Sequence, residues 1–114
     1  MSESVIEIVP APGTWVVRAG GAVLGESSNA LELREKGLKP VIYFPRADIS
    51  MPFIEPSDTR TRCPHKGDAS YYGIVAKSGL IADAVWSYED PLPQAEAIRG
   101  HLAFDKDRVA VEQL

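Results

Sequence analysis

Apolar positions recur along the chain in short runs that alternate with polar positions and end at Gly or Pro. Residues 5–9 form the first such run, and residues 14–19 and 22–26 form two more on either side of Gly20-Gly21. A Gly-Gly pair supplies the positive φ angles that a two-residue hairpin turn requires. The spacing therefore predicts a strand at 5–9 and a hairpin whose turn is Gly20-Gly21.

The segment 29–37 fits two patterns. Asn29 and Glu32 have the spacing of a helix capping box, and Gly37 could end a helix. Leu31 and Leu33 alternate with polar neighbours, as expected of a strand with one buried face. We favour the strand.

The rest of the chain continues the pattern of short strands, which we expect at 41–44, 59–63, 70–77, 80–88, 101–104 and 108–111. The pairs 70–77 with 80–88 and 101–104 with 108–111 are predicted hairpins, and 46–56 is predicted to be irregular with one helical turn. A short helix is predicted near 91–98, with Asp90 as its cap, Pro91 in its first turn and Gly100 at its end. The predicted fold is mainly β: a compact antiparallel sheet, or a barrel-like sheet that is closed or nearly so, of about seven to nine short strands.

Composition narrows the class of protein. With 114 residues the chain is expected to form a single domain, 1–114. A net charge of −4 gives no general attraction for nucleic acid or anionic membranes, so neither is an expected partner. No apolar run approaches the roughly 20 residues of a membrane helix, and Met1–Val5 lacks the features of a signal peptide. The single cysteine, Cys63, suits a reducing compartment, and we expect a cytoplasmic location.

The stretch 62–67, Arg-Cys-Pro-His-Lys-Gly, is the segment most able to carry chemistry. Nearby cations favour the thiolate, and Arg62, His65 and Lys66 all lie within three residues of Cys63. The segment could therefore be a reactive or ligand-binding loop. It could equally be a turn that ends a strand, with Cys63 as a small core residue and solvated charges around it.

Catalysis and metal binding find less support in the sequence. Cys63 with His65 or His101 could form a thiol–imidazole pair only if the fold brings the two side chains together. Cys-x-His is not a typical zinc spacing and no second cysteine exists, so we expect neither a metal site nor a cofactor.

Aromatic residues on three predicted strands form a second group of candidates. Trp86 and Tyr88 are two residues apart and share a strand face, and the same parity would place the small Ala82 and Ala84 beside them. Small residues next to large ones can leave a pocket. The predicted ligand-binding set combines these aromatics with the loop: Tyr43, Cys63, His65, Lys66, Trp86 and Tyr88.

The motifs in their order along the chain resemble a known family, the domain of unknown function 427. The matching motifs are Gly20-Gly21, Tyr43-Phe44-Pro45, Cys63-Pro64-His65-Lys66-Gly67, Trp86-Ser87-Tyr88 and Ala103-Phe104. The family usually has Tyr where His65 stands and commonly an aromatic residue where Asp105 stands. The resemblance implies a compact antiparallel β domain similar to the β-tent group. It also brings a nucleotidyltransferase label, although no typical carboxylate metal site is evident here.

Three functions remain open at this point. The favoured hypothesis is a small-molecule-binding β domain, with a pocket edged by the Cys-Pro-His-Lys-Gly loop and a small anionic or planar ligand. The second is an enzyme that uses Cys63, or a transferase acting on a nucleotide-like substrate. The third is a protein-interaction module, which should present a flat apolar surface instead of a pocket.

Overall fold

The computed structural model describes residues 5–114, and this part of the chain forms ten β-strands and three short 3₁₀ helices. The strands are β1 (Ile6–Pro10), β2 (Trp15–Ala19), β3 (Ala22–Ser27), β4 (Leu31–Glu35), β5 (Val41–Tyr43), β6 (Ile54–Cys63), β7 (Gly67–Ala76), β8 (Gly79–Ser87), β9 (Ala103–Phe104) and β10 (Ala110–Gln113). The helices are η1 (Arg46–Asp48), η2 (Met51–Phe53) and η3 (Pro93–Ile98).

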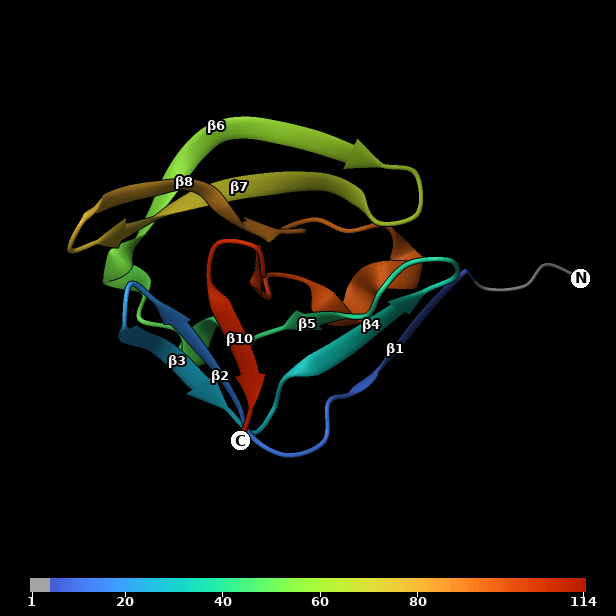
Figure 1. Ribbon diagram of the computed structural model, residues 1–114. Coiled ribbons are helices and arrows are strands. Elements are labelled where there is room, and N and C mark those ends of the chain that lie inside the picture. Colours follow the sequence, from blue (N-terminus) through green and yellow to red (C-terminus); the bar gives the residue numbers. More distant parts are fainter. Residues whose placement is uncertain (1–4) are drawn as a thin grey trace, which may run out of the picture.

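The strands form three antiparallel sheets, ordered β6-β7-β8-β9, β10-β2-β3 and β1-β4-β5. In Figure 1 the first sheet lies above the other two, which meet at the foot of the view and diverge upwards as a V. The prediction of a mainly-β antiparallel fold is confirmed. The predicted closure is wrong, because the described strands form three separate sheets and the β6–β9 sheet meets β5 through an isolated bridge between Leu102 and Phe44.

Two apolar cores fill the space beneath the upper sheet. The first core packs that sheet against β2 and β3, with Val17, Phe44 and Ile74 fully buried at its centre. The second core packs the same sheet against β1, β4 and β5, and includes Leu33 and Ile98. The aromatic candidates of the sequence belong to this second core. The upper sheet therefore serves both cores. The β10-β2-β3 sheet covers the first core, and the β1-β4-β5 sheet covers the second and also packs Ile42 against the first.

Several local predictions are confirmed. The Gly20-Gly21 hairpin joins β2 to β3, and both glycines have positive φ, at 56° and 83°. The ambiguous segment forms the strand β4, which lies between β1 and β5. The hairpin between β7 and β8 also forms, although its turn is one residue earlier than expected. The segment 46–56, predicted to be irregular with one helical turn, differs from the prediction: it holds two helical turns, η1 and η2, and its last three residues belong to β6, which begins at Ile54.

The predicted helix near 91–98 is shorter than expected and is not an α-helix. It begins at Pro93 as a 3₁₀ helix, its geometry is interrupted at Ala95, and no side chain caps it. The residue before a proline is driven out of the helical region, so Pro93 keeps Leu92 extended, at ψ 156°. A helix starting at Pro91 with Asp90 as its cap is therefore excluded. Asp90 forms an ion pair with Arg99 instead.

The predicted last hairpin is also wrong. Its first half, β9, pairs with β8, whereas its second half, β10, pairs with β2 in a different sheet. Between them Asp105 accepts hydrogen bonds from the Asp107 amide and the Arg108 guanidinium, which form the turn. A tight turn between two short strands has the same local pattern whether or not the strands pair, so the sequence could not distinguish the two arrangements.

The expectation for the N-terminus concerns residues 1–4, which lie outside the described part of the chain. Within residues 5–114 there is no helix with the length and apolar character needed to cross a membrane.

Gly25 provides a test of the packing between β3 and the segment after η1. A bridge joins Gly25 to Ile49, and a Cβ atom on Gly25 would collide with the Asp48 carbonyl oxygen and lie 2.6 Å from Ile49 Cδ1. We expect Gly25→Ala to lower the free energy of unfolding by about 1–3 kcal/mol, measured by urea denaturation. The control Val23→Ala, at an exposed site in the same strand, should change it by about 0.5 kcal/mol or less. Equal losses would contradict the steric argument.

Candidate functional site

The Lys66 side chain lies at the end of the β6–β7 hairpin and reaches across to the neighbouring sheet. Its Nζ is 2.5 Å from Glu35 Oε1 at the end of β4, and each side chain is only 12% exposed. The same Nζ lies 5.8 Å from the centre of the Tyr88 ring, within the range of a cation–π contact. Lys66 is thus held between a carboxylate and an aromatic ring. Glu35, which the sequence analysis did not select, is its partner.

The local backbone explains how the turn positions Lys66. The Lys66 amide bonds to the Cys63 carbonyl at 3.3 Å, which closes the turn. The Lys66 carbonyl then accepts a 2.9 Å hydrogen bond from the Leu92 amide, and Gly67 has φ +109°. A side chain at Gly67 would be strained at that φ and would contact the Leu92 amide. Pro64 and Gly67, which lie before and after Lys66 in the sequence, therefore suit a turn that packs against the segment before η3.

Tyr43 and Trp86 meet across two different sheets. Trp86 Nε1 in β8 donates a 3.2 Å hydrogen bond to the Tyr43 hydroxyl in β5, whose side chain is 1% exposed. The Trp86 ring lies against Tyr71 of β7, with ring centres 6.5 Å apart. Tyr71 was not in the predicted set, and its hydroxyl bonds to Thr61 at 3.0 Å. Trp86 and Tyr71 are both half-buried and form the outer wall of this group.

Tyr88 completes the group, and its hydroxyl has no hydrogen-bond partner among residues 5–114. The residue is 6% exposed. Within the described chain, every side-chain nitrogen or oxygen that is shut off from solvent has a partner. The Tyr88 hydroxyl must therefore keep a small contact with solvent. A deeply placed, unpaired hydroxyl that is still accessible is a suitable group for binding a ligand.

Burial changes the acidity of both buried tyrosines. It raises the pKa of Tyr43 and of Tyr88 well above the usual value near 10, because a phenolate would lose its hydration. The Trp86 hydrogen bond partly opposes this for the Tyr43 pKa, whereas Glu35, Cys63 and Tyr71 act on both pKa values in the upward direction. At neutral pH both phenols are therefore hydrogen-bond donors. We call the group formed by Tyr43, Cys63, Tyr71, Trp86 and Tyr88 the phenol cluster.

The thiol and the two histidines are less closely associated. Cys63 is half-buried and packs against the second core. The backbone carbonyl of His65 accepts a hydrogen bond from Gln94, and His101 Nδ1 lies 3.1 Å from the Arg99 carbonyl. No hydrogen bond among residues 5–114 joins Cys63 to either imidazole. In the same part of the chain no three side chains of His, Cys, Asp or Glu form a group that could hold a metal ion.

The expectation that Ala82 and Ala84 share the face of Trp86 and Tyr88 is wrong. Asp83 has a positive φ of 54°, and the pairing of β7 with β8 shifts between Tyr72 and Ile74. This irregularity breaks the alternation of side chains along β8. As a result Ala82 is exposed and Ala84 packs in the first core, so neither of them leaves space beside Trp86.

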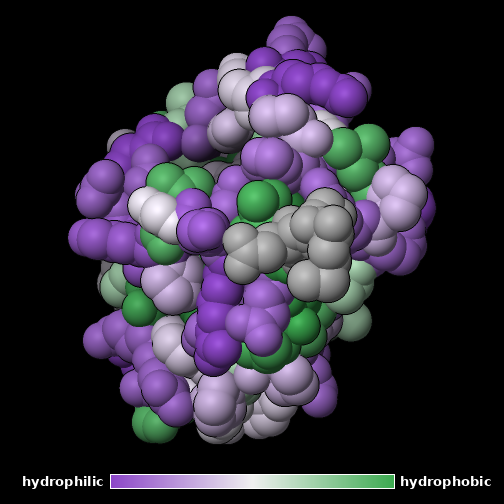
Figure 2. Space-filling model, turned by 90° about the vertical axis from the view of Figure 1, so that its right-hand side faces the viewer, coloured by the Kyte–Doolittle hydropathy of each residue, from purple (hydrophilic) through white to green (hydrophobic). Residues whose placement is uncertain are grey.

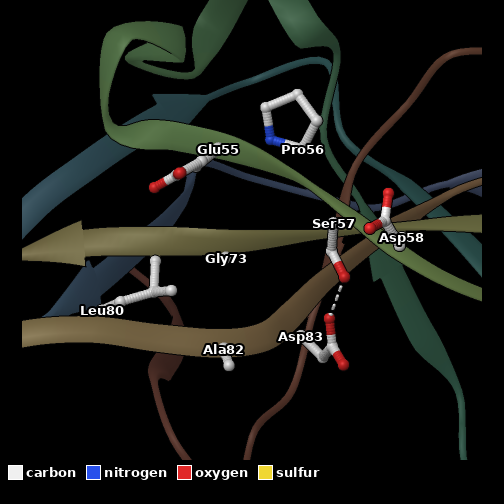
Figure 3. Close-up of a pocket in the computed structure, with 8 residues that line it drawn as sticks. All are labelled: Glu55, Pro56, Ser57, Asp58, Gly73, Leu80, Ala82 and Asp83. Carbon is white, nitrogen blue, oxygen red and sulfur yellow. Dashed lines mark hydrogen bonds between the residues drawn. The ribbon is translucent and has the colours of Figure 1, made fainter.

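The same irregularity forms a cavity of about 230 Å³, shown in Figure 3. Ser57 Oγ and Thr59 Oγ1 donate hydrogen bonds of 2.6 and 2.7 Å to the two carboxylate oxygens of Asp83, and these bonds lower the Asp83 pKa. Arg108 donates to the carbonyls of Ala82 and Asp83. Asp83 thus joins the irregular part of β6 to the irregular part of β8. This structural role accounts for the strained backbone of Asp83.

Of five well-formed concavities among residues 5–114, the phenol cluster touches one. That concavity, of about 330 Å³, is lined by Trp86 and by Ile42, Phe104 and Lys106 among others. Tyr43, Cys63, Lys66 and Tyr88 line none of the five. Figure 2 views the end of the molecule that carries the β6–β7 turn, where apolar residues reach the surface among hydrophilic ones. The cluster is therefore a closely packed group in which Trp86 faces open space.

The sequence from residue 7 to residue 113 matches the family model described as Domain of unknown function (DUF427), which also bears the name NTP_transf_9. The chain belongs to the DUF427 family. The resemblance inferred from the motifs is thereby confirmed over nearly the whole chain. No curated protein is similar enough to match.

The ion pair between Lys66 and Glu35 predicts a clear pattern of stabilities. Lys66→Met should lower the free energy of unfolding by about 3 kcal/mol, because it leaves the Glu35 carboxylate buried and unpaired. Adding Glu35→Leu should restore most of that loss. Removing the exposed pair of Arg18 and Glu112 through Arg18→Met should cost less than about 1 kcal/mol. Denaturation by urea measures all three, and equal stability of the single and double variants would contradict the argument.

The raised pKa values predict how the tyrosines respond to alkali. When the folded protein is brought to about pH 11, Tyr43 and Tyr88 should stay protonated and add no phenolate absorbance. Because the unfolded chain releases these protons more readily, stability should fall as pH rises above about 10. Tyr43→Phe and Tyr88→Phe should leave the folded-state signal unchanged and reduce the signal of the denatured protein. A reduction in both states would show that the two phenols ionise in the folded protein.

Proposed function

We propose that this DUF427 protein binds a small organic molecule at the phenol cluster. The observation that carries the proposal is the Tyr88 hydroxyl, which is deep in the second core, unpaired within residues 5–114 and still in contact with solvent. Four side chains of the predicted set, those of Tyr43, Cys63, Trp86 and Tyr88, belong to this cluster, and Lys66 contacts Tyr88. Aromatic walls with a few convergent polar groups are typical of ligand sites.

Access to the cluster would come from the side of Trp86. Trp86 packs against the second core and also lines the concavity of about 330 Å³, a volume at the lower end of the range for ligand pockets. The Cys-Pro-His-Lys-Gly loop contributes to this site chiefly through Lys66, which the Glu35 carboxylate holds in place. The lone Cys63 supports a location in the reducing cytoplasm.

A protein-interaction role is a second candidate, because exposed apolar side chains gather beside the β2–β3 hairpin and the end of β7. Val23, Phe53 and Val75 are each about half exposed and line a concavity of about 270 Å³ beside the Gly20-Gly21 turn. This surface shares no residue with the phenol cluster, so substitutions can separate the two candidate functions.

The proposal is tested by screening a fragment mixture of neutral, anionic and cationic compounds with ligand-observed NMR. Fragments that bind should lose at least about fivefold in affinity with Trp86→Phe or Tyr88→Phe, as expected when a packing or hydrogen-bond contact is removed. The control Val75→Ser, on the other apolar surface, should leave their affinity unchanged. Fragments weakened by Val75→Ser and not by the cluster variants would place the binding surface elsewhere.

A further inference from the structure

Residues from all three sheets line the concavity of about 330 Å³ that Trp86 faces. Its apolar residues are Trp86 in β8, Phe104 in β9, Val41 and Ile42 in β5, and Val111 in β10. All of them except Phe104 are partly exposed. The Trp86 indole N–H already donates to the Tyr43 hydroxyl, so Trp86 offers the concavity ring surface and no free donor. This part of the lining suits a flat apolar group, and the volume suits a small ligand.

Four charged residues complete the lining: Lys39, Asp105, Lys106 and Asp107. The charge of Asp105 is already compensated inside the protein. Its carboxylate accepts a 3.0 Å hydrogen bond from the Arg108 guanidinium and another from the Asp107 amide, and these bonds lower the Asp105 pKa. Asp105 is therefore an ionised carboxylate with its own cation beside it, and it adds little net charge to the concavity.

Lys39, Lys106 and Asp107 have no such compensation. Within residues 5–114 no ion pair or hydrogen bond engages either ammonium group or the Asp107 carboxylate, and all three residues are exposed. Two uncompensated cations therefore stand against one uncompensated carboxylate around the same concavity. The charge left for a ligand is positive, and it lies next to apolar and aromatic surface. Such a combination favours a ligand of opposite charge.

From these features we propose that the concavity beside Trp86 binds a small compound with a flat apolar body and one anionic group. The flat body lies against Trp86 and its apolar neighbours, and the anionic group lies near the ammonium groups of Lys39 and Lys106. Lysine suits this role because its charge stands at the end of a flexible stem. Lys66, the cation that the sequence indicated, is neutralised by Glu35 and does not line this concavity.

The inference goes beyond the proposed function, because none of its contacts involves the Tyr88 hydroxyl. Tyr88 lines none of the five concavities described above among residues 5–114, and Trp86 alone is common to the concavity and the phenol cluster. The two proposals can therefore fail separately. Substitutions at Lys39 and Lys106 test the inference, whereas a substitution at Tyr88 tests the proposed function.

The test uses three probes that share one ring: benzoate, which is anionic, benzamide, which is neutral, and benzyltrimethylammonium, which is cationic. Ligand-observed NMR on the full chain gives the affinities, and the indole N–H resonance of Trp86, assigned by its loss in Trp86→Phe, reports the location. At low salt benzoate should bind at least about fivefold more tightly than either other probe. Added salt should weaken benzoate and leave benzamide unchanged, because it screens exposed charges.

Substitutions of the charged residues should move benzoate affinity in opposite directions. Lys39→Gln and Lys106→Gln should each weaken benzoate about two- to fourfold, and Asp107→Asn should strengthen it about twofold. The double lysine variant should bind benzoate and benzamide equally. Lys77→Gln is the matched control, because it removes the same charge from an exposed lysine that lines a different concavity. It should leave the affinity for benzoate unchanged.

Equal affinities for benzoate and benzamide would overturn the inference, and so would a loss in Lys77→Gln as large as in the other lysine variants. Tyr88→Phe should leave benzoate binding unchanged. A loss of about fivefold in that variant would place the ligand at the phenol cluster, which overturns the inference and supports the proposed function. If no probe shifts the Trp86 resonance, the inference is overturned, and the fragment screen decides the proposed function separately.

Discussion

The ion pair of Lys66 and Glu35 holds together two parts of the molecule that are far apart in sequence. Glu35 ends β4 in one sheet, and Lys66 stands in the turn between β6 and β7 of another. The second core lies between these sheets, and Tyr43, Tyr88 and Leu33 are buried in it. With both charges largely withdrawn from water, each depends on the other for compensation. The pair therefore fixes the distance between the sheets at the place where the phenol cluster forms.

This arrangement also determines the chemical character of the cluster. A lysine beside tyrosines would by itself attract anions and lower the pKa of the phenols. Glu35 cancels that charge, and burial then dominates the pKa of Tyr43 and Tyr88 and raises both. The outcome is a neutral group of donors inside an aromatic enclosure. A ligand bound at the proposed site would therefore meet neutral donors and aromatic rings in the cluster itself.

Much of the fold could be predicted from local pattern, since its strands are short and bounded by Gly and Pro. The Gly20-Gly21 hairpin and the strand β4 are examples. Failures occurred where two signals conflicted or where pairing was non-local. Pro93 overrides the capping signal of Asp90, and β10 leaves its apparent hairpin partner for β2. The first failure came from weighing two local signals against each other. The second could not be deduced from the segment itself, because the partner strand β2 is distant in the sequence.

The candidate site likewise contains residues that could be selected from the sequence and residues that could not. Tyr43, Trp86 and Tyr88 could be selected because large aromatic residues on predicted strands are expected to be buried, and the structure brings them together. Glu35 could not be selected, since a carboxylate at the end of a strand is ordinary and its partner is 31 residues away. The role of Asp83 was hidden too, because it depends on Ser57 and Thr59 in a neighbouring strand.

The irregular stretch of β6 has a consequence for how the molecule meets copies of itself. β6 is an edge of the four-stranded sheet, with unpaired backbone groups along its outer side. An exposed edge of ten residues can recruit a strand from another chain and start aggregation. Here Pro56 removes an amide donor, the pairing register shifts before Arg60, and charged side chains follow along the strand. The hydrogen bonds from Ser57 and Thr59 to Asp83 hold the irregular part of this edge in place. An uneven edge with charged side chains discourages the sheet from growing by strand addition.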